Sequence, residues 1–423
     1  MTAETPARVT ADAVARRSYG KLVAYLAADM RDVSATEDAL SDAFAAALAD
    51  WPVNGCPANP EAWLMTVARR KGIDGARRRH SGDVAAAHLR VMAEMHAEFA
   101  AVTDDAAIPD RRLALLFACA HPAIDVTVRA PLMLQTVLGL DAKAIASAFL
   151  ASPDAMAKRL GRAKQKIRQA GIPFAIPERD ELAERLQGVL DAIYATFTEG
   201  WSDLDDADLL RRDLADEALF LARLLVELMP KEPEAIGLLA CMLYAEARRR
   251  ARRNAQGDYV PLGEQETSLW DVSMIDEAEL LLRNAAAFGR MGRYQLEAAL
   301  QSAHVERRRS GRTHWIPELQ LYHALYTLTG SPVVALNRAL VIAESEGPRA
   351  ALDILDTLSA DPRLAAYQPY WAARAALLAR IGDSQQAHHA YEIAVGLTRD
   401  SAVRRFLQAR QAALPVLGDK RND

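Results

Sequence analysis

Cysteine is scarce in this chain, and the cysteines present lie far apart. Cys56, Cys119 and Cys241 are the three cysteines in 423 residues, and no two of them have the spacing of a metal-binding pair. Separated thiols also cannot build the disulfide framework that stabilises many small secreted domains. We therefore expect reduced thiols and no metal site built on cysteine.

Long apolar runs are also absent. A membrane-spanning helix needs roughly 18 consecutive apolar residues, whereas charged residues or prolines interrupt even the most apolar stretch, "LALLFACAHPAIDVTVRAPLML". The first residues, "MTAETPARVTADAVARRS", lack the apolar core of a signal peptide. With 51% apolar and 25% charged residues, the composition is that of an ordinary globular protein. We expect a cytoplasmic protein without a membrane partner.

Familiar catalytic motifs are missing as well. The sequence contains no Gly-rich phosphate loop ending in Lys-Ser/Thr, no His-Glu-x-x-His and no Gly-x-Ser-x-Gly. The acidic run "DLDDAD" at 203–208 lacks the glycine and the distal glutamate of a calcium loop. We expect neither an enzyme nor a bound cofactor or metal ion.

Helix-forming residues dominate what is present. Ala, Leu, Arg and Glu prevail, and apolar residues recur every three or four positions, so the fold class is expected to be all-α. Residues 1–172 carry 22 Lys and Arg against 19 Asp and Glu, whereas residues 173–423 carry 29 against 37. This change coincides with "AGIPFAIPERD" at 170–180, where the main domain boundary is expected. The long loop at 254–271 is expected to be either functional or mobile.

A basic segment, "WLMTVARRKGIDGARRRH", spans residues 63–80. It holds six Lys and Arg residues in eighteen positions and a single acid, Asp74. Asn59, Pro60 and Glu61 supply the start of a helix just upstream. A salt-bridged, solvated face is one interpretation, but one acid cannot balance so many bases, and the surplus favours DNA phosphates. The predicted DNA contacts here are Arg69, Arg70, Lys71, Arg77, Arg78 and Arg79.

A second basic segment, "DAKAIASAFLASPDAMAKRLGRAKQKIR" at 141–168, predicts a helix, a short turn and a second helix. Asp141 and Ser152 are positioned to cap the two helices. Met156, Leu160, Ala163 and Ile167 would face the core, and Asp154, Lys158, Arg162 and Gln165 would face outward. This is the layout of a helix-turn-helix, although any amphipathic helix pair shares part of it. The predicted DNA-binding residues are Ser152, Asp154, Lys158, Arg159, Arg162 and Lys166.

Three blocks of sequence resemble a known family. "ATEDALSDAFAAALADW", "NPEAWLMTVARRKGIDGARRRH" and "GLDAKAIASAFLASPDAMAKRLGRAKQKIR" occur in this order. They resemble regions two and four of the extracytoplasmic-function (ECF) group of sigma-70 RNA polymerase sigma factors. The resemblance implies region two at 10–80, a linker at 81–107 and a region-four helix-turn-helix domain at 108–172.

The resemblance also implies a function, namely binding core RNA polymerase and directing promoter-specific initiation of transcription. Asp38, Leu40, Asp42 and Phe44 would then dock on the clamp coiled-coil of the polymerase, and region four would meet its flap. Ser41 stands where the family commonly has glutamine. The resemblance further implies that the loop at 52–60 holds a base extruded from promoter DNA.

The C-terminal half resembles the extension of an ECF subgroup that carries helices like those of tetratricopeptide (TPR) repeats. Trp371 is followed by Ala387, Tyr391 and Ala394 at the spacing of a TPR unit. A generic helical bundle is the alternative. We expect a TPR-like regulatory domain at 180–423 that contacts the sigma module or the polymerase and acts in cis. The competing function is a TPR-containing DNA-binding regulator that works without core polymerase.

Overall fold

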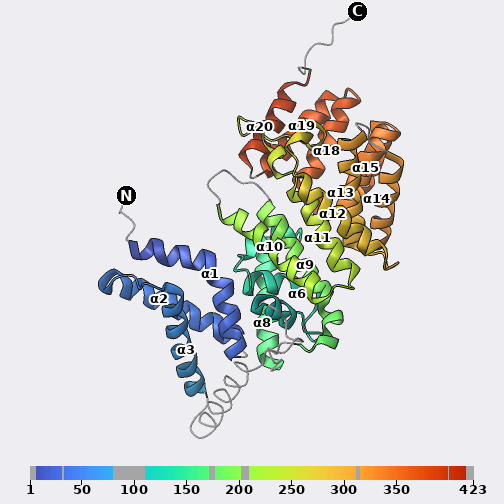
Figure 1. Cartoon of the computed structure of the whole chain (residues 1–423). Helices are drawn as coiled ribbons and strands as arrows, with labels where there is room; N and C mark the ends of the chain where they lie inside the picture. The colour runs from blue at the N-terminus through green and yellow to red at the C-terminus, as the bar shows by residue number, and fades with distance from the viewer. Residues whose placement is uncertain are drawn as a thin grey trace, which may run out of the picture. The chain divides into compact units, whose positions relative to one another are not determined.

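A computed structural model describes residues 6–30, 33–79, 110–170, 177–201, 209–310, 315–398 and 400–415. Across these ranges the chain is helical and contains no strand, so the all-α prediction is confirmed (Figure 1). The chain divides into two compact units, Met1–Glu199 and Gly200–Asp423. Within the described ranges, no helix is both long and apolar enough to cross a membrane. The predicted linker at 81–107 lies outside the described residues.

The first unit opens with three helices that pack on one another: α1 (Pro6–Met30), α2 (Val33–Asn54) and α3 (Pro60–Arg79). Their core contains Leu26, Leu40 and Leu64, each without exposed surface. The indole rings of Trp51 and Trp63 meet edge to face with centroids 5.5 Å apart, which joins the end of α2 to the start of α3.

The first unit continues with α5 (Arg111–Cys119), α6 (Val126–Thr136), α7 (Ala142–Ala148), α8 (Pro153–Ala170) and α9 (Leu182–Trp201). Ala195 of α9 belongs to the same buried cluster as Leu132 of α6 and Leu160 of α8. The boundary expected at 170–180 therefore falls inside this unit. The sequence there contains two prolines, but α9, which follows it, packs with α6 and α8, which precede it.

The second unit is a succession of helices in which neighbours along the chain pack together. Its helices are α10 (Leu209–Leu228), α11 (Pro233–Glu246), α12 (Val272–Ala286), α13 (Arg293–Ser310), α14 (Trp315–Thr329), α15 (Pro332–Ser345), α16 (Pro348–Leu358), α17 (Pro362–Ala365), α18 (Gln368–Arg380), α19 (Ser384–Leu397) and α20 (Ser401–Ala412). The residues singled out in α19, Ala387, Tyr391 and Ala394, are buried in one cluster with Tyr370 of α18.

A loop between α11 and α12, residues 253–271, contacts the last helix of the same unit; we call it the return loop. The Arg253 guanidinium lies 2.6 Å from the Asp400 carboxylate, and Asp258 pairs with Arg405 at 3.0 Å. Tyr259 meets Phe406 edge to face with ring centroids 5.4 Å apart. A stretch notable in the sequence for its length is thus bound to residues almost 150 positions later in the chain.

Candidate nucleic-acid interface

The predicted helix, short turn and second helix are present as α7 and α8. The Asp141 carboxylate accepts a hydrogen bond from the Ala144 amide at 2.7 Å, and the Ser152 hydroxyl accepts one from the Ala155 amide at 3.3 Å. Both predicted N-caps are therefore confirmed. Between the helices, Leu150 takes a left-handed backbone conformation with φ of 50°, which an L-residue adopts at some cost. Within the turn the Leu150 amide donates to the Ser147 carbonyl oxygen at 3.4 Å, and the Ala151 amide donates to the Ala146 carbonyl oxygen at 2.9 Å.

The inward face of α8 matches its sequence pattern. Met156 and Leu160 are buried in the core of this part of the unit, and Ala163 and Ile167 pack against that core while partly exposed. A helix with these residues fixed inward must turn the opposite side chains toward solvent. Asp154, Lys158, Arg162 and Gln165 are exposed, as predicted.

The outward face of α8 carries cations that form no ion pair with an acid among the described residues. Within the described part of the chain, neither Lys158, Arg162 nor Lys166 is paired with a carboxylate; Arg162 Nε instead donates to the Lys158 carbonyl oxygen at 3.4 Å. Arg159 is half-buried, and both it and Lys166 lie close enough to Asp125 to help lower the pKa of that carboxyl, although hydrogen bonds from Thr127 contribute most. A solvated cationic face of this kind suits a polyanion.

Lys164 of α8 forms an ion pair with an acid of α2. Its ammonium lies 2.7 and 3.0 Å from the two carboxylate oxygens of Glu37 on α2, and both side chains are mostly buried. Burial raises the pKa of the neighbouring Cys119 thiol; Glu37 adds to the rise and Lys164 opposes it. The helix-turn-helix is thus joined to α2 by an ion pair, which no local sequence pattern could reveal because the partners are 127 residues apart.

The basic helix α3 begins as predicted. The Asn59 side-chain oxygen accepts a hydrogen bond from the Ala62 amide at 3.0 Å, so Asn59 is the N-cap. Arg69, Arg70 and Lys71 are exposed one to two turns after the buried Leu64. Helix α3 extends to Arg79, so the backbones of residues 77–79 are helical. The side chains of Arg77, Arg78 and Arg79 lie outside the described part of the structure.

The predicted docking residues on α2 do not share one face. Asp38 and Asp42 are exposed one helical turn apart, and Phe44 is half-buried. Leu40 has no exposed surface because it packs in the core of its own three-helix group. A partner can therefore reach Asp38, Asp42 and the edge of Phe44 on this helix, whereas Leu40 supports the helix from within.

The loop between α2 and α3 is shorter than the predicted 52–60. Helix α2 continues through Pro52 to Asn54, and the Gly55 amide then donates to the Trp51 carbonyl oxygen at 3.0 Å. Gly55 has φ of 87°, a conformation that favours glycine and ends the helix. The irregular segment is 55–59, and Val53 beside it is 82% exposed.

Comparison with known proteins places the chain in a family without giving it an activity. An uncharacterized protein of Rhizobium meliloti (strain 1021) is 38% identical over 395 residues, which cover 93% of this chain and 92% of that protein. The chain belongs to the family of this Rhizobium protein. Residues 185–286 also match a family of unknown function, DUF6596. No solved structure matches the chain.

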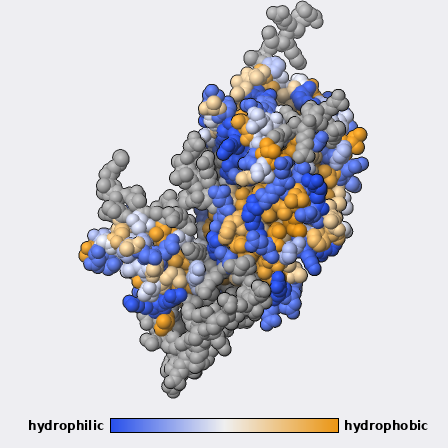
Figure 2. Space-filling model, viewed as in Figure 1, coloured by the Kyte–Doolittle hydropathy of each residue, from blue (hydrophilic) through white to orange (hydrophobic). Residues whose placement is uncertain are grey.

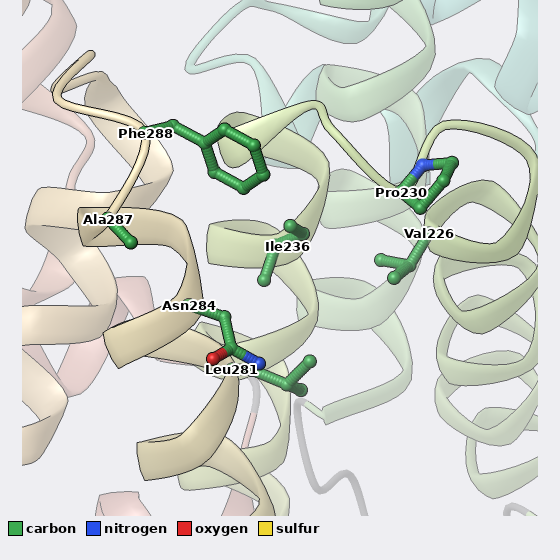
Figure 3. Close-up of a pocket in the computed structure, with 7 residues that line it drawn as sticks. All are labelled: Val226, Pro230, Ile236, Leu281, Asn284, Ala287 and Phe288. Atoms are coloured by element: carbon green, nitrogen blue, oxygen red, sulfur yellow. The ribbon is translucent and has the colours of Figure 1, made fainter.

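The DUF6596 segment begins on α9 and ends on α12. Its first helix therefore lies mainly in the first unit, and the rest of the segment lies in the second. The segment also supplies most of a cavity of about 410 Å³ between α10, α11 and α12 (Figure 3). The cavity is lined by Val226, Pro230, Ile236, Leu281, Asn284, Ala287 and Phe288.

This cavity is apolar except for the Asn284 amide, and it holds no charged side chain. Leu280 and Phe288 are exposed large hydrophobic residues on α12 and just beyond it. On the face shown in Figure 2, hydrophobic residues in orange are interspersed with hydrophilic residues in blue. None of the residues that line the cavity is a nucleophile, an acid or a base.

Proposed function

We propose that the protein is an ECF-type sigma factor that binds core RNA polymerase and directs promoter-specific transcription initiation. The observation that carries the proposal is α8. It is capped at Ser152 and held inward by Met156 and Leu160, and it presents Lys158 and Arg162 to solvent without an acidic partner among the described residues. In this proposal α8 reads an upstream promoter element in the major groove.

Two further surfaces have parts in the proposal. The exposed acids Asp38 and Asp42 on α2 would dock on the basic clamp coiled-coil of polymerase, and α3 would follow the downstream element with its exposed cations. The helices α1–α3 would act as region two, α5–α8 as region four, and the second unit as a TPR-like regulatory domain acting in cis.

Run-off transcription with purified core polymerase tests the proposal. We expect the full-length chain to bind promoter DNA weakly alone and to support initiation from a defined site once core polymerase is added. A DNA-binding regulator that works without polymerase would instead bind a duplex unaided, commonly as a dimer on a palindrome. Tight unaided binding together with failure to initiate would overturn the sigma assignment.

A test of regulation in cis needs a fragment that keeps the part of α9 that packs in the first unit. A chain that ends near residue 176 would lose Ala195 from the core that also holds Leu160 of α8. A chain that ends at Glu199 retains the whole first unit. If Met1–Glu199 transcribes the same promoters as efficiently as the full-length protein, the second unit is a passenger and regulation in cis fails.

A further inference from the structure

The C-terminal end of α9 is held by an arginine that follows α11. The Arg252 guanidinium lies 3.8 Å from the centre of the Trp201 indole ring. Its Nη1 also donates a hydrogen bond of 2.6 Å to the Trp201 carbonyl oxygen. A cation over an aromatic face is attracted by the ring, and a cation at the last carbonyls of a helix is favoured by the helix dipole. Arg252 therefore fixes the last turn of α9.

The body of α9 is built into the domain that contains the helix-turn-helix. Arg185 Nη1 donates to the Phe117 carbonyl oxygen of α5 at 3.4 Å. At Gly188 the helix comes so close to α6 that an added Cβ would lie 3.3 Å from the Met133 methyl carbon. Between one and two turns before the end of the helix, Ala195 shares a buried cluster with Met156 of α8.

These contacts form a continuous packed route to the recognition helix. Helix α9 packs on α6 at Gly188, α6 packs on α8, and Met156 of α8 lies in the cluster that Ala195 completes. Close-packed interiors transmit small displacements because they contain little free space. The DUF6596 segment includes both Arg252 and the helix that it holds, so a single family domain contains the arginine and the start of the route.

We infer that α9 couples the segment carrying Arg252 to the recognition helix, with Arg252 setting the position of α9 and α9 setting the stability of α8. The inference deepens the proposed function, since it rests on α8 as the DNA-reading element. A ligand or partner that shifts the segment carrying Arg252 would alter DNA recognition without touching DNA.

Hydrogen–deuterium exchange of the full-length protein tests the coupling. In R252A we expect the amides of α8 to exchange roughly three- to tenfold faster than in wild type, the range that removal of a cation–π interaction allows. R250A is the matched control, because Arg250 is the exposed neighbour two positions earlier. Faster exchange confined to the last turn of α9, with α8 unchanged, would overturn the inference.

A conservative variant guards against a general loss of folding. R252K keeps a cation that can lie over Trp201 and should restore most of the protection of α8. Exchange in α18 and α19 should match wild type in both Arg252 variants, since the buried cluster that joins these helices contains no residue of the segment that carries Arg252. Equal acceleration in R252K and R252A, or acceleration throughout α18 and α19, would mean that Arg252 only supports the fold.

The exchange experiment needs neither DNA nor polymerase, so it separates the two proposals. If α8 responds to Arg252 while core polymerase never initiates, the sigma assignment fails and the coupling stands. If the protein directs initiation while amide exchange in α8 is unchanged in R252A, the coupling alone fails.

Discussion

The outward cations of α8 in the first unit differ in their pairing from many arginines of the second unit. On α8 of the first unit, Lys158, Arg162 and Lys166 face solvent without an acidic partner among the described residues, and Asp38 and Asp42 on α2 are exposed. Arginines of the second unit are repeatedly paired with acids from other segments of that unit. Examples are Arg223 with Glu277, Arg374 with Asp356, Arg380 with Glu344, and Arg410 with Glu264.

This difference shows why the number of arginines alone is a poor guide to nucleic-acid binding. An arginine in an ion pair must give up its carboxylate before it can bind a phosphate. An unpaired cation can bind a phosphate directly and release counterions from DNA. The second unit is rich in arginine, yet many of these arginines form ion pairs with carboxylates of the same unit. Predictions that separate unpaired from paired charges therefore test the functional proposal most directly.

The largest effect is expected on α2. Reversing both exposed acids in D38K/D42K places like charges opposite the proposed basic clamp, and should weaken binding of core polymerase by about a hundredfold. Helix content by circular dichroism should not change, because both side chains are exposed. The control is D180K/E184K, which makes the same charge change at exposed positions elsewhere in the first unit. Equal binding by the two variants would remove α2 as the docking surface.

The next effect concerns selectivity on α8. Each good contact with a base contributes about 1–3 kcal/mol, so K158A/R162A should lose at least about 30-fold in preference for the upstream element. Binding of core polymerase should remain at the wild-type level. Competition between promoters that differ in the upstream element measures this ratio, and an unchanged preference would show that α8 does not read bases.

A smaller and non-selective effect is expected on α3. Replacing Arg77, Arg78 and Arg79 with glutamine should weaken binding to many promoters alike, by roughly tenfold at moderate salt. The slope of log affinity against log salt should become shallower by about 0.9 for each phosphate that the variant no longer neutralises. Titrations at several salt concentrations provide the test. A loss limited to one promoter sequence would indicate base recognition instead.

The smallest effect is expected from paired arginines. R405A/R410A removes two exposed ion pairs between the return loop and α20. The decrease in unfolding free energy should stay below about 1 kcal/mol per pair and should shrink further in high salt. DNA binding should not change. Weaker DNA binding by this variant would break the distinction between paired and unpaired charges.

Local structure around the candidate site could be predicted because its causes are local. Asp141 and Ser152 bind amides three residues away, and Met156 and Leu160 recur on one helical face. Capping preference and helical periodicity are both properties of short segments. The all-α class and the order of helix, short turn and helix at 142–170 therefore follow from the amino-acid sequence alone.

Contacts between distant segments could not be predicted in the same way. No residue near Lys164 in the sequence identifies Glu37 as its partner. The small residues Gly188 and Ala195 likewise do not indicate which helices they pack against. The resemblance to sigma factors implies a docking role for Leu40, yet the neighbouring helices bury its side chain. Composition locates a break at 170–180, but tertiary packing decides which side α9 joins.

The return loop changes the order in which the helices of the second unit are expected to unfold. In an open helical array each repeat touches only its neighbours, so the ends fray first and the array melts in stages. Here Arg253 and Asp400 join residues 147 positions apart, with both side chains largely shielded from solvent. Removal of α20 would release Arg253, which immediately follows the arginine that holds α9. Truncation of α20 would thus remove a contact that stabilises residues in the middle of the chain.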